Sequence, residues 1–313
     1  MDASVVIPTH NRREQVLRAV RALLDQDYAP HAYEIIVCCD RCTDGTAEAL
    51  QAITDLRLRV VPAAPAGQAA ALNAGWRLAR GRLAIVIDDE AEPLTGFVKA
   101  HVLAHRGANT ARIAVTGYSP ALFDRGASPI TRYMAGNYDA YFAGLQRDGD
   151  RNTPLDLCGS NFSITLSNLE EEGGLNESYF FQRNDFELAT RLLENGYEFR
   201  FCRDAEAPIR ISIDADSLVG RTTARAQNDY RLAREHPWCI PYLPFYRGLS
   251  NSRGRQRWRL LWAICGPAAA LINLARRVSP RRLHLFRLEY AARYCLALKQ
   301  EIGDWQSFSR LGT

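Results

Sequence analysis

The first part of the chain alternates short apolar runs with longer amphipathic stretches. Four apolar runs have the length and composition of buried strands, at residues 4–8, 34–38, 58–61 and 83–87. Helices are predicted between them. The stretch 12–27 has apolar residues at helical spacing, 43–53 follows a helix start signal at 43–46, and 68–80 ends before Gly81. This alternation predicts an α/β fold with a mostly parallel, Rossmann-like sheet covered by helices on both faces, and ligands at the carboxyl ends of its strands.

Beyond residue 93 the alternation becomes less regular. Helices are predicted at 94–104, 128–147 and 185–195, and strands at 113–118 and 197–202. Residues 155–165 are predicted to form a strand or a hairpin around Gly159. We therefore expect one domain over residues 1–213, with halves at 1–93 and 94–213, followed by a helical extension over 214–313.

The extension combines apolar and basic residues. From residue 247 to the end it has 13 Lys/Arg against 3 Asp/Glu, although the net charge of the whole chain is only +4. An apolar stretch at 258–275 contains Gly266 and Pro267, and a basic amphipathic helix is predicted at 281–301 after Pro280. Its uninterrupted apolar part, about 16 residues, is shorter than the roughly 20 residues of a membrane span. Residues 247–301 therefore predict either a hairpin in the interface of an anionic membrane or a helical lid.

Composition and cysteine usage suggest the compartment. Apolar residues make up 47% of the chain, which is typical of a globular protein. The first strand begins almost at Met1, so no signal peptide is expected, and we predict a cytoplasmic protein at or near the inner face of the membrane with reduced cysteines. Neither Cys38, Cys39 and Cys42 nor the pair His101 and His105 is interpreted as a zinc site; the two histidines are expected at the surface.

The acidic triplet Asp88, Asp89 and Glu90 directly follows the run at 83–87. Three acids at one strand end repel one another unless a cation or solvent relieves the repulsion. One or two carboxylates together with substrate phosphates are the usual way in which proteins hold Mg²⁺. The triplet therefore predicts Mg²⁺ or Mn²⁺, which would stabilise a diphosphate leaving group. A solvated acidic turn is the alternative.

Three further motifs precede this triplet. The first strand ends in VIPTHNR, the second leads into CDRCTDGT, and the next helix contains AALNAG. In this order the four motifs resemble those of glycosyltransferase family 2. The resemblance covers roughly residues 4–213 and implies a GT-A catalytic domain that binds a nucleotide-sugar donor in residues 1–93 and an acceptor in 94–213.

The resemblance implies roles for individual residues of the first half. Glu90 is the implied direct metal ligand, with Asp88 beside it. Cys39 replaces an acid of the turn that contacts the base. The implied donor-nucleotide residues are Pro8, Thr9, Asn11, Arg12, Asp40, Asn73, Asp88 and Asp89.

In the second half, GGLNESYFF and NDFELATRL resemble the family's acceptor-side signature and imply Asp185 as the catalytic base. Asn184 stands where the family usually has Glu. Arg191 is four residues from Glu187, which favours a salt bridge that also shapes the donor loop. Arg210 stands where many members have a metal-binding His and is expected to meet a phosphate. The implied acceptor and diphosphate region comprises Gly159, Ser160, Asn161, Asn184 and Arg191.

The function predicted from these residues is transfer of a sugar from a nucleotide-diphosphate sugar to a glycan or lipid-linked acceptor, as in cell-envelope glycan synthesis. One base and a single displacement give inversion at the anomeric carbon. A non-catalytic nucleotide-sugar-binding homologue stays open as an alternative. A sugar nucleotidyltransferase is disfavoured because residues 9–12 lack the glycines of a triphosphate-binding loop. No nucleic-acid partner is expected, because the basic residues accompany long apolar runs.

Overall fold

The computed structural model describes residues 1–61, 67–106, 112–149, 151–179, 182–278 and 283–311. The predicted break at Pro280, with Arg281 and Arg282, lies outside these residues, as do Phe180 and Phe181 of the acceptor-side signature. The chain divides into two compact units. The first comprises Met1–Phe123, Ala135–Phe180 and Asn184–Ile211, and the second Asp124–Met134, Phe181–Arg183 and Ser212–Thr313.

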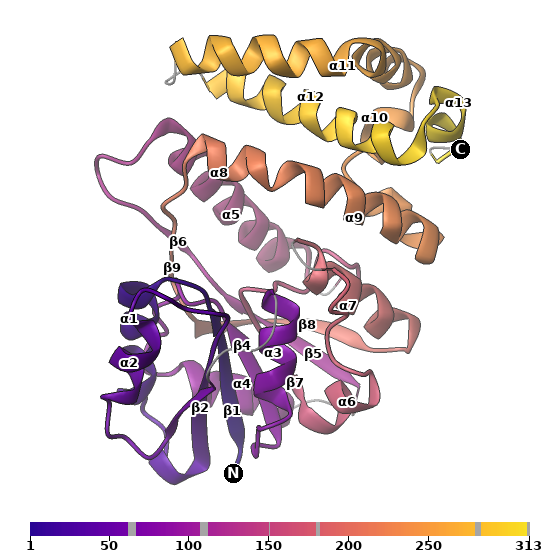
Figure 1. Cartoon of the computed structure of the whole chain (residues 1–313). Coiled ribbons are helices and arrows are strands. Elements are labelled where there is room, and N and C mark those ends of the chain that lie inside the picture. Colours follow the sequence, from indigo (N-terminus) through magenta and orange to yellow (C-terminus); the bar gives the residue numbers. More distant parts are fainter. Residues whose placement is uncertain (62–66, 107–111, 150, 180–181, 279–282, 312–313) are drawn as a thin grey trace. The chain divides into compact units, whose positions relative to one another are not determined.

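Within the described residues, seven strands of the first unit form one sheet in the order β3-β2-β1-β4-β7-β5-β8 (Figure 1). The strands are β1 (Ala3–Thr9), β2 (Tyr33–Cys39), β3 (Leu58–Val61), β4 (Leu83–Ile87), β5 (Ile113–Tyr118), β7 (Asn161–Thr165) and β8 (Glu198–Glu206). Neighbours among β1 to β4 pair in parallel, whereas β7 is antiparallel to both β4 and β5. The predicted mostly parallel α/β sheet is confirmed. Residues 155–165 were predicted to form a strand or a hairpin. The structure has a strand there, which begins at Asn161 and ends at Thr165.

Helices cover the sheet, and a short parallel pair of strands, β6 (Ala121–Leu122) and β9 (Ile209–Arg210), lies apart from it. The helices named here are α1 (Arg13–Leu24), η1 (Pro30–Ala32), α2 (Thr46–Gln51), α3 (Gln68–Trp76), α4 (Phe97–Arg106), α5 (Pro129–Asp148), α6 (Leu166–Glu171) and α7 (Asn184–Glu194).

Side-chain alternation along β1 divides the core into two layers. Val5 and Ile7 pack with residues of α1 and α4, such as Val20 and Val98. Val6 belongs to the opposite layer, with residues of α3 and α7. Strands buried on both faces read as continuous apolar runs, which explains why the first strands were visible in the sequence.

Gly75 lets helix α3 approach the sheet closely. A Cβ atom at this position would lie 2.5 Å from Cγ1 of Val6 and 2.7 Å from Sγ of Cys38. The glycine of the AALNAG motif is therefore a packing requirement that lets the last turn of α3 lie against β1 and β2.

The expectation that His101 and His105 lie at the surface is wrong. They are 0% and 8% exposed on α4, facing β7. The ring atoms of His101 lie 2.9 Å from Oδ1 of Asn161 and 2.8 Å from Oγ of Ser163, and His105 lies 2.9 Å from the same Oγ. Burial lowers the pKa of His101 to about 3 and that of His105 to about 4. Both rings are therefore neutral parts of a buried hydrogen-bond network.

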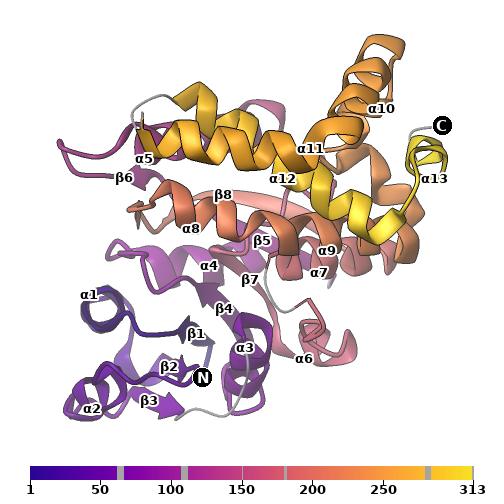
Figure 2. The same ribbon diagram turned by 45° about the horizontal axis from the view of Figure 1, so that its top comes forward.

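The second unit is helical. Its elements include α8 (Ala215–Gly220), α9 (Thr222–Glu235), η2 (Pro237–Tyr242), α10 (Tyr246–Leu249), α11 (Ser252–Val278), α12 (Leu283–Ile302) and α13 (Trp305–Arg310). Helices α11 and α12 lie side by side, and α12 also contacts α9 (Figure 2). A buried aromatic cluster supports this arrangement, with the rings of Trp262 and Phe308 stacked 4.7 Å apart.

Helix α11 is longer than the apolar stretch suggested. It runs through Gly266 and Pro267 without a break and is long and apolar enough to cross a membrane by length and composition alone. Only 17% of its most apolar window is buried. The predicted apolar stretch at 258–275 is therefore part of one longer helix, and the exposed surface of α11 needs an explanation of its own.

Candidate active site

The acidic triplet lies at the carboxyl end of β4, next to the end of β1. Asp89 accepts hydrogen bonds from Oγ1 of Thr9 at 2.8 Å and from the guanidinium of Arg12 at 3.1 Å. The same guanidinium forms an ion pair with Glu90. Arg12, which the sequence assigned to the nucleotide, therefore holds two of the three acids in place.

Asp88 is held differently from its two neighbours. Its Oδ1 accepts a hydrogen bond from Nε2 of Gln68 at 3.2 Å. Burial, followed by the charges of Asp89 and Glu90, raises the pKa of Asp88 to about 8, and Asp185 contributes in the same direction. The surroundings of this carboxyl therefore disfavour its ionised form and would favour it only with an added positive charge.

This chemistry fits a divalent cation. Among the residues that the structure describes, no three His, Cys, Asp or Glu side chains form a ready-made metal cluster. A pair of carboxylates completed by phosphate oxygens is the arrangement that Mg²⁺ favours in proteins. Asp88 and Glu90 supply such a pair at one strand end, and a cation there would compensate the repulsion that raises the pKa of Asp88.

Asp185 lies in the first turn of α7. Its Oδ1 accepts a hydrogen bond from the amide of Phe186 at 2.8 Å, and its Oδ2 accepts one from the amide of Gly159 at 3.2 Å. A Cβ atom on Gly159 would lie only 2.6 Å from this Oδ2. Glycine is therefore required at position 159 for the backbone to reach the carboxylate.

Two short bridges connect the acidic triplet with Asp185. Through side chains, Gln68 donates to Asp88 and accepts a hydrogen bond from Nδ2 of Asn184 at 3.3 Å, next to Asp185. Through the backbone, the amide of Asp88 donates to the carbonyl of Ser160 at 3.3 Å, and the amide of the neighbouring Gly159 donates to Asp185. Segments distant in the sequence thus bring Asp88 and Asp185 near one another.

The loops after β1 and β2 brace one another beside the triplet. Pro8 and Thr9 are buried at the end of β1. Asn11 has a left-handed φ of 52°, and its Oδ1 accepts a hydrogen bond from the amide of Thr43 at 2.7 Å. Asp40 accepts one from the amide of Gly67 at 2.8 Å, at the start of α3. These residues shape the predicted nucleotide pocket; their contact with a nucleotide stays a prediction.

Asn73 is used within the protein. Its Nδ2 donates to the carbonyl of Leu175 and to Oε1 of Glu177, each at 2.9 Å, and its Oδ1 accepts a hydrogen bond from the amide of Leu175 at 3.0 Å. Only 5% of this side chain is exposed. Asn73 therefore anchors the loop before α7, and its contact with a nucleotide stays a prediction.

Asn161 also has a structural role. It is fully buried, accepts from His101, and donates through Nδ2 to the carbonyl of Ala205 at 3.0 Å. Its side chain therefore lies in the polar network of the core, which corrects its placement in the acceptor region. Gly159 and Ser160, two residues earlier, are the members of this motif that adjoin the acids.

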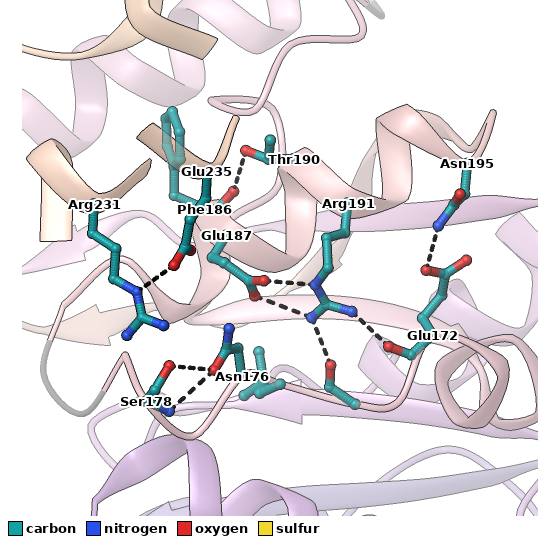
Figure 3. Close-up of polar contacts among 12 residues, drawn as sticks. Glu172, Asn176, Ser178, Phe186, Glu187, Thr190, Arg191, Asn195, Arg231 and Glu235 are labelled. Atoms are coloured by element: carbon teal, nitrogen blue, oxygen red, sulfur yellow. Dashed lines mark hydrogen bonds and ion pairs between the residues drawn. The ribbon is translucent and has the colours of Figure 1, made fainter. Parts of the chain in front are cut away.

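Arg191 forms the salt bridge that its spacing predicted. Its guanidinium binds both carboxylate oxygens of Glu187, at 2.6 and 3.0 Å, and donates to the carbonyls of Glu172 and Gly174 at 2.6 and 2.7 Å (Figure 3). These bonds fix the turn between α6 and α7. Arg191 thus shapes a loop, and its placement in the acceptor or diphosphate region stays a prediction.

Arg210 contacts Glu92, with a distance of 3.1 Å between Nε and Oε1, and Glu92 also binds Arg18 at 3.2 Å. The expected phosphate contact of Arg210 stays a prediction. All eight cysteines are free, and burial raises the pKa of Cys38 and of Cys39 to about 12. Cys38 and Cys39 are buried at the end of β2, whereas Cys42 is half-buried.

Sequence reasoning missed two residues of this site. Gln68 opens α3 and links the triplet to α7, a role that its position at the start of a helix does not reveal. Tyr138 on α5 is hydrogen-bonded to Ser160, and burial together with Cys158 and Asp88 raises its pKa well above the usual range. The aromatic-rich composition of the helix at 128–147 was the available signal for Tyr138.

The family model described as Glycosyl transferase family 2 matches residues 4–164. The match covers β1 to β7, with the loops that brace the triplet and the triplet itself. The fold and the acidic strand end together define a GT-A type protein, and the chain belongs to glycosyl transferase family 2.

Curated relatives are similar over most of this chain. Validoxylamine A glucosyltransferase of Streptomyces hygroscopicus subsp. limoneus is 27% identical over 291 residues, covering 82% of this chain and 62% of that protein. Probable glycosyltransferase YdaM of Bacillus subtilis strain 168 is 25% identical over 207 residues, covering 63% of this chain and 48% of that protein. The chain therefore spans less than two thirds of the length of either relative.

Solved structures show the same fold over nearly the whole chain. A mannosyltransferase from Pyrobaculum calidifontis, in complex with GDP-Man and Mn²⁺, aligns with a TM-score of 0.62 and 18% identity over 96% of this chain and 87% of that one. Residues 1–349 of TarS from S. aureus align with a TM-score of 0.56 and 15% identity, over 97% and 92%. At 18% and 15% sequence identity, these two alignments establish a shared fold and no shared substrate.

Proposed function

We propose that this chain is an inverting glycosyltransferase that moves a hexose from a nucleotide-diphosphate sugar to a hydroxyl of a glycan or lipid-linked acceptor. The observation that carries the proposal is the convergence of Asp88 and Asp185 through two short hydrogen-bonded bridges. Family membership and the glucosyl- and mannosyltransferase names of similar proteins support the choice of a hexose.

Each acid has a separate task in this proposal. Asp185 takes the proton of the acceptor hydroxyl while that oxygen forms a bond to the anomeric carbon. The bond from this carbon to the diphosphate breaks, and its electron pair leaves with the nucleoside diphosphate. Attack from the face opposite the leaving group inverts the configuration, so one base is sufficient.

Asp88 and Glu90 would hold Mg²⁺ or Mn²⁺, and the cation would neutralise charge on the departing diphosphate. Arg12 contacts Asp89 at 3.1 Å and also pairs with Glu90, so a cation at this strand end would share Glu90 with the guanidinium. The Mn²⁺ bound in the P. calidifontis mannosyltransferase supports this choice of cofactor.

A ligand screen tests donor binding first. Thermal unfolding is followed with UDP-, GDP- and dTDP-sugars, with and without Mn²⁺ or Mg²⁺. We expect one class of nucleotide sugar to raise the melting temperature only when the metal is present, because ligands that bind the native state stabilise it. No stabilisation by any of these donors would contradict the proposal.

A matched pair of variants assigns the metal effect to the triplet. Glu90→Gln removes a charge from the proposed metal pair, whereas Glu198→Gln makes the same change on β8 outside the site. We expect the first variant to lose the metal-dependent part of the stabilisation and the second to keep it. Retention of the full metal effect by Glu90→Gln would refute its role as a ligand.

A further inference from the structure

Helix α11 presents an apolar stripe to solvent. Leu260, Ile264, Leu271 and Leu274 are 64%, 56%, 68% and 63% exposed. At about 3.6 residues per turn, these positions fall on one side of the helix. Every exposed residue between Leu260 and Ala275 is apolar. We call this surface the α11 stripe.

The other side of α11 is already packed. Trp262, Cys265 and Ala269 are at most 5% exposed, and α12 lies alongside. Toward the end of the helix, Arg276 forms an ion pair with Glu289 of α12 at 2.6 Å, and Asn273 donates to the same carboxylate at 2.7 Å. The α11 stripe is therefore not the face that stabilises the hairpin.

Basic residues flank the α11 stripe. Four exposed arginines precede it on the first turns of the helix, and the exposed Arg277 follows it. The sequence from Ser252 to Val278 contains no acid. The four preceding residues are Arg253, Arg255, Arg257 and Arg259.

We propose that α11 lies in the plane of an anionic membrane, with the α11 stripe among the acyl chains and the flanking arginines at the lipid phosphates. Apolar area supplies the affinity, and positive charge selects anionic lipid. The side packed on α12 keeps its place in the protein. This inference is independent of the proposed reaction.

The packing distinguishes this arrangement from a membrane-spanning helix. A hairpin that crossed the membrane would carry Glu289 and its partners into hydrocarbon, where charged groups are costly. Helix α12 also binds Asp229 of the polar helix α9 through the hydroxyl of Tyr294 at 2.5 Å. A helix lying in the interface avoids burying these charges in lipid.

Charge also argues against a second copy of the chain on the α11 stripe. A two-fold contact uses the same surface on both copies. Arginine-rich ends of one helix would then meet arginine-rich ends of the other, without acids on either helix to compensate them. An anionic lipid surface supplies the opposite charge.

Flotation with lipid vesicles tests the proposal on the full chain. The wild type is mixed with phosphatidylcholine vesicles or with vesicles that also contain phosphatidylglycerol, whose negative surface attracts basic segments. We expect binding to the anionic vesicles that weakens as salt is added. Failure of the wild type to bind anionic vesicles would overturn the proposal.

Variants locate the binding surface. Leu260→Glu with Leu271→Glu should lower vesicle affinity at least tenfold, because burial of one leucine is worth roughly that factor. Leu56→Glu is the matched control, since Leu56 is 100% exposed in the first unit. Melting curves confirm that the variants fold. Equal binding by the double variant and the wild type would overturn the assignment.

Two further experiments test the role of the flanking arginines and the oligomeric state of the chain. Replacing the four arginines before the α11 stripe by Gln should remove the preference for anionic vesicles, by roughly fivefold for each residue. Sedimentation without lipid tests whether a second copy of the chain binds the α11 stripe. If the wild type forms a dimer that Leu260→Glu with Leu271→Glu dissociates, and it binds no vesicles, the α11 stripe binds a second copy of the chain and not a membrane.

Discussion

The acids at the end of β4 and the histidines behind β7 are both polar groups inside the first unit, yet they are held in opposite ways. His101 and His105 are buried with hydrogen-bonding partners that suit neutral rings. Asp88 is instead buried beside Asp89, Glu90 and Asp185, and burial followed by these charges raises its pKa. A satisfied polar network stabilises a fold, whereas crowded like charges indicate a place for a ligand.

The predicted site residues fall into the same two groups, those whose polar groups are bonded within the protein and those that lie among other acids. Asn73, Asn161 and Arg191 use their hydrogen-bonding groups on the protein's own loops and strands. Asp88 and Asp185 lie at the ends of β4 and α7 beside one another. Variants of the second group should therefore lower turnover, and variants of the first group should lower stability.

The largest effect is expected from Asp185→Asn. Removing a general base usually costs on the order of 10²- to 10⁴-fold in rate. Donor affinity should change little, because the base acts on the acceptor proton in the transition state. Asp204→Asn, at an exposed position of β8, is the control. Full turnover by Asp185→Asn in a steady-state assay would show that another group is the base.

Gly159→Ala should have the next largest effect. The added methyl group would lie 2.6 Å from Oδ2 of Asp185 and must displace it. A shift of about 1 Å in a catalytic group lowers the rate by roughly 10²-fold. Gly96→Ala adds the same group in open space and should leave kcat unchanged. Comparable kcat values for both alanine variants would show that the Gly159 contact does not position the base.

Arg191→Ala should act on stability. It leaves the buried carboxylate of Glu187 without its guanidinium, and breaking such a pair costs about 3 kcal/mol. Arg200→Ala removes an exposed pair with Glu198, which is worth less than about 1 kcal/mol. Urea denaturation measures both losses. If Arg191→Ala unfolds at the wild-type urea concentration, its role as a loop anchor is wrong.

The histidine network predicts a pH dependence of stability. Between about pH 4 and 6.5, His101 and His105 become protonated in the unfolded chain. In the folded protein the same buried rings stay neutral, because their pKa values are about 3 and 4. The free energy of unfolding should therefore fall as the pH is lowered through this range, by up to about 1.4 kcal/mol per pH unit for each histidine.

His105→Gln should reduce that slope by about one proton, and the exposed His31→Gln should not change it. Denaturation series at several pH values provide the slopes. An unchanged slope in His105→Gln would mean that His105 does not remain neutral in the folded protein.

Much of the fold was visible in the sequence because buried parallel strands leave continuous apolar runs. The runs at 83–87 and 113–118 coincide with the buried strands β4 and β5, and the predicted strand at 58–61 coincides with the half-buried β3. Helix ends were less visible: the stretch at 68–80 yields a helix ending at Trp76. The antiparallel direction of β7 could not be read from its residues, because pairing depends on contacts distant in the sequence.

Motif order identified the acids of the site, since strand ends of a parallel sheet meet at one edge. It did not distinguish ligands from anchors. Asn161 follows Gly159 closely in the sequence, yet strand alternation directs it into the core toward His101. Likewise, nothing in the spacing of His101 and His105 shows that β7 covers them with Ser163.

The configuration of the sugar released from the donor tests the proposed reaction most directly. Proton NMR follows an α-linked nucleotide sugar, chosen by the ligand screen, with water as the acceptor, in the wild type and in Asp185→Asn. We predict metal-dependent release of the β-anomer first by the wild type, and donor binding without comparable release by the variant. Initial release of the α-anomer, or equal release by both proteins, would contradict inversion by Asp185.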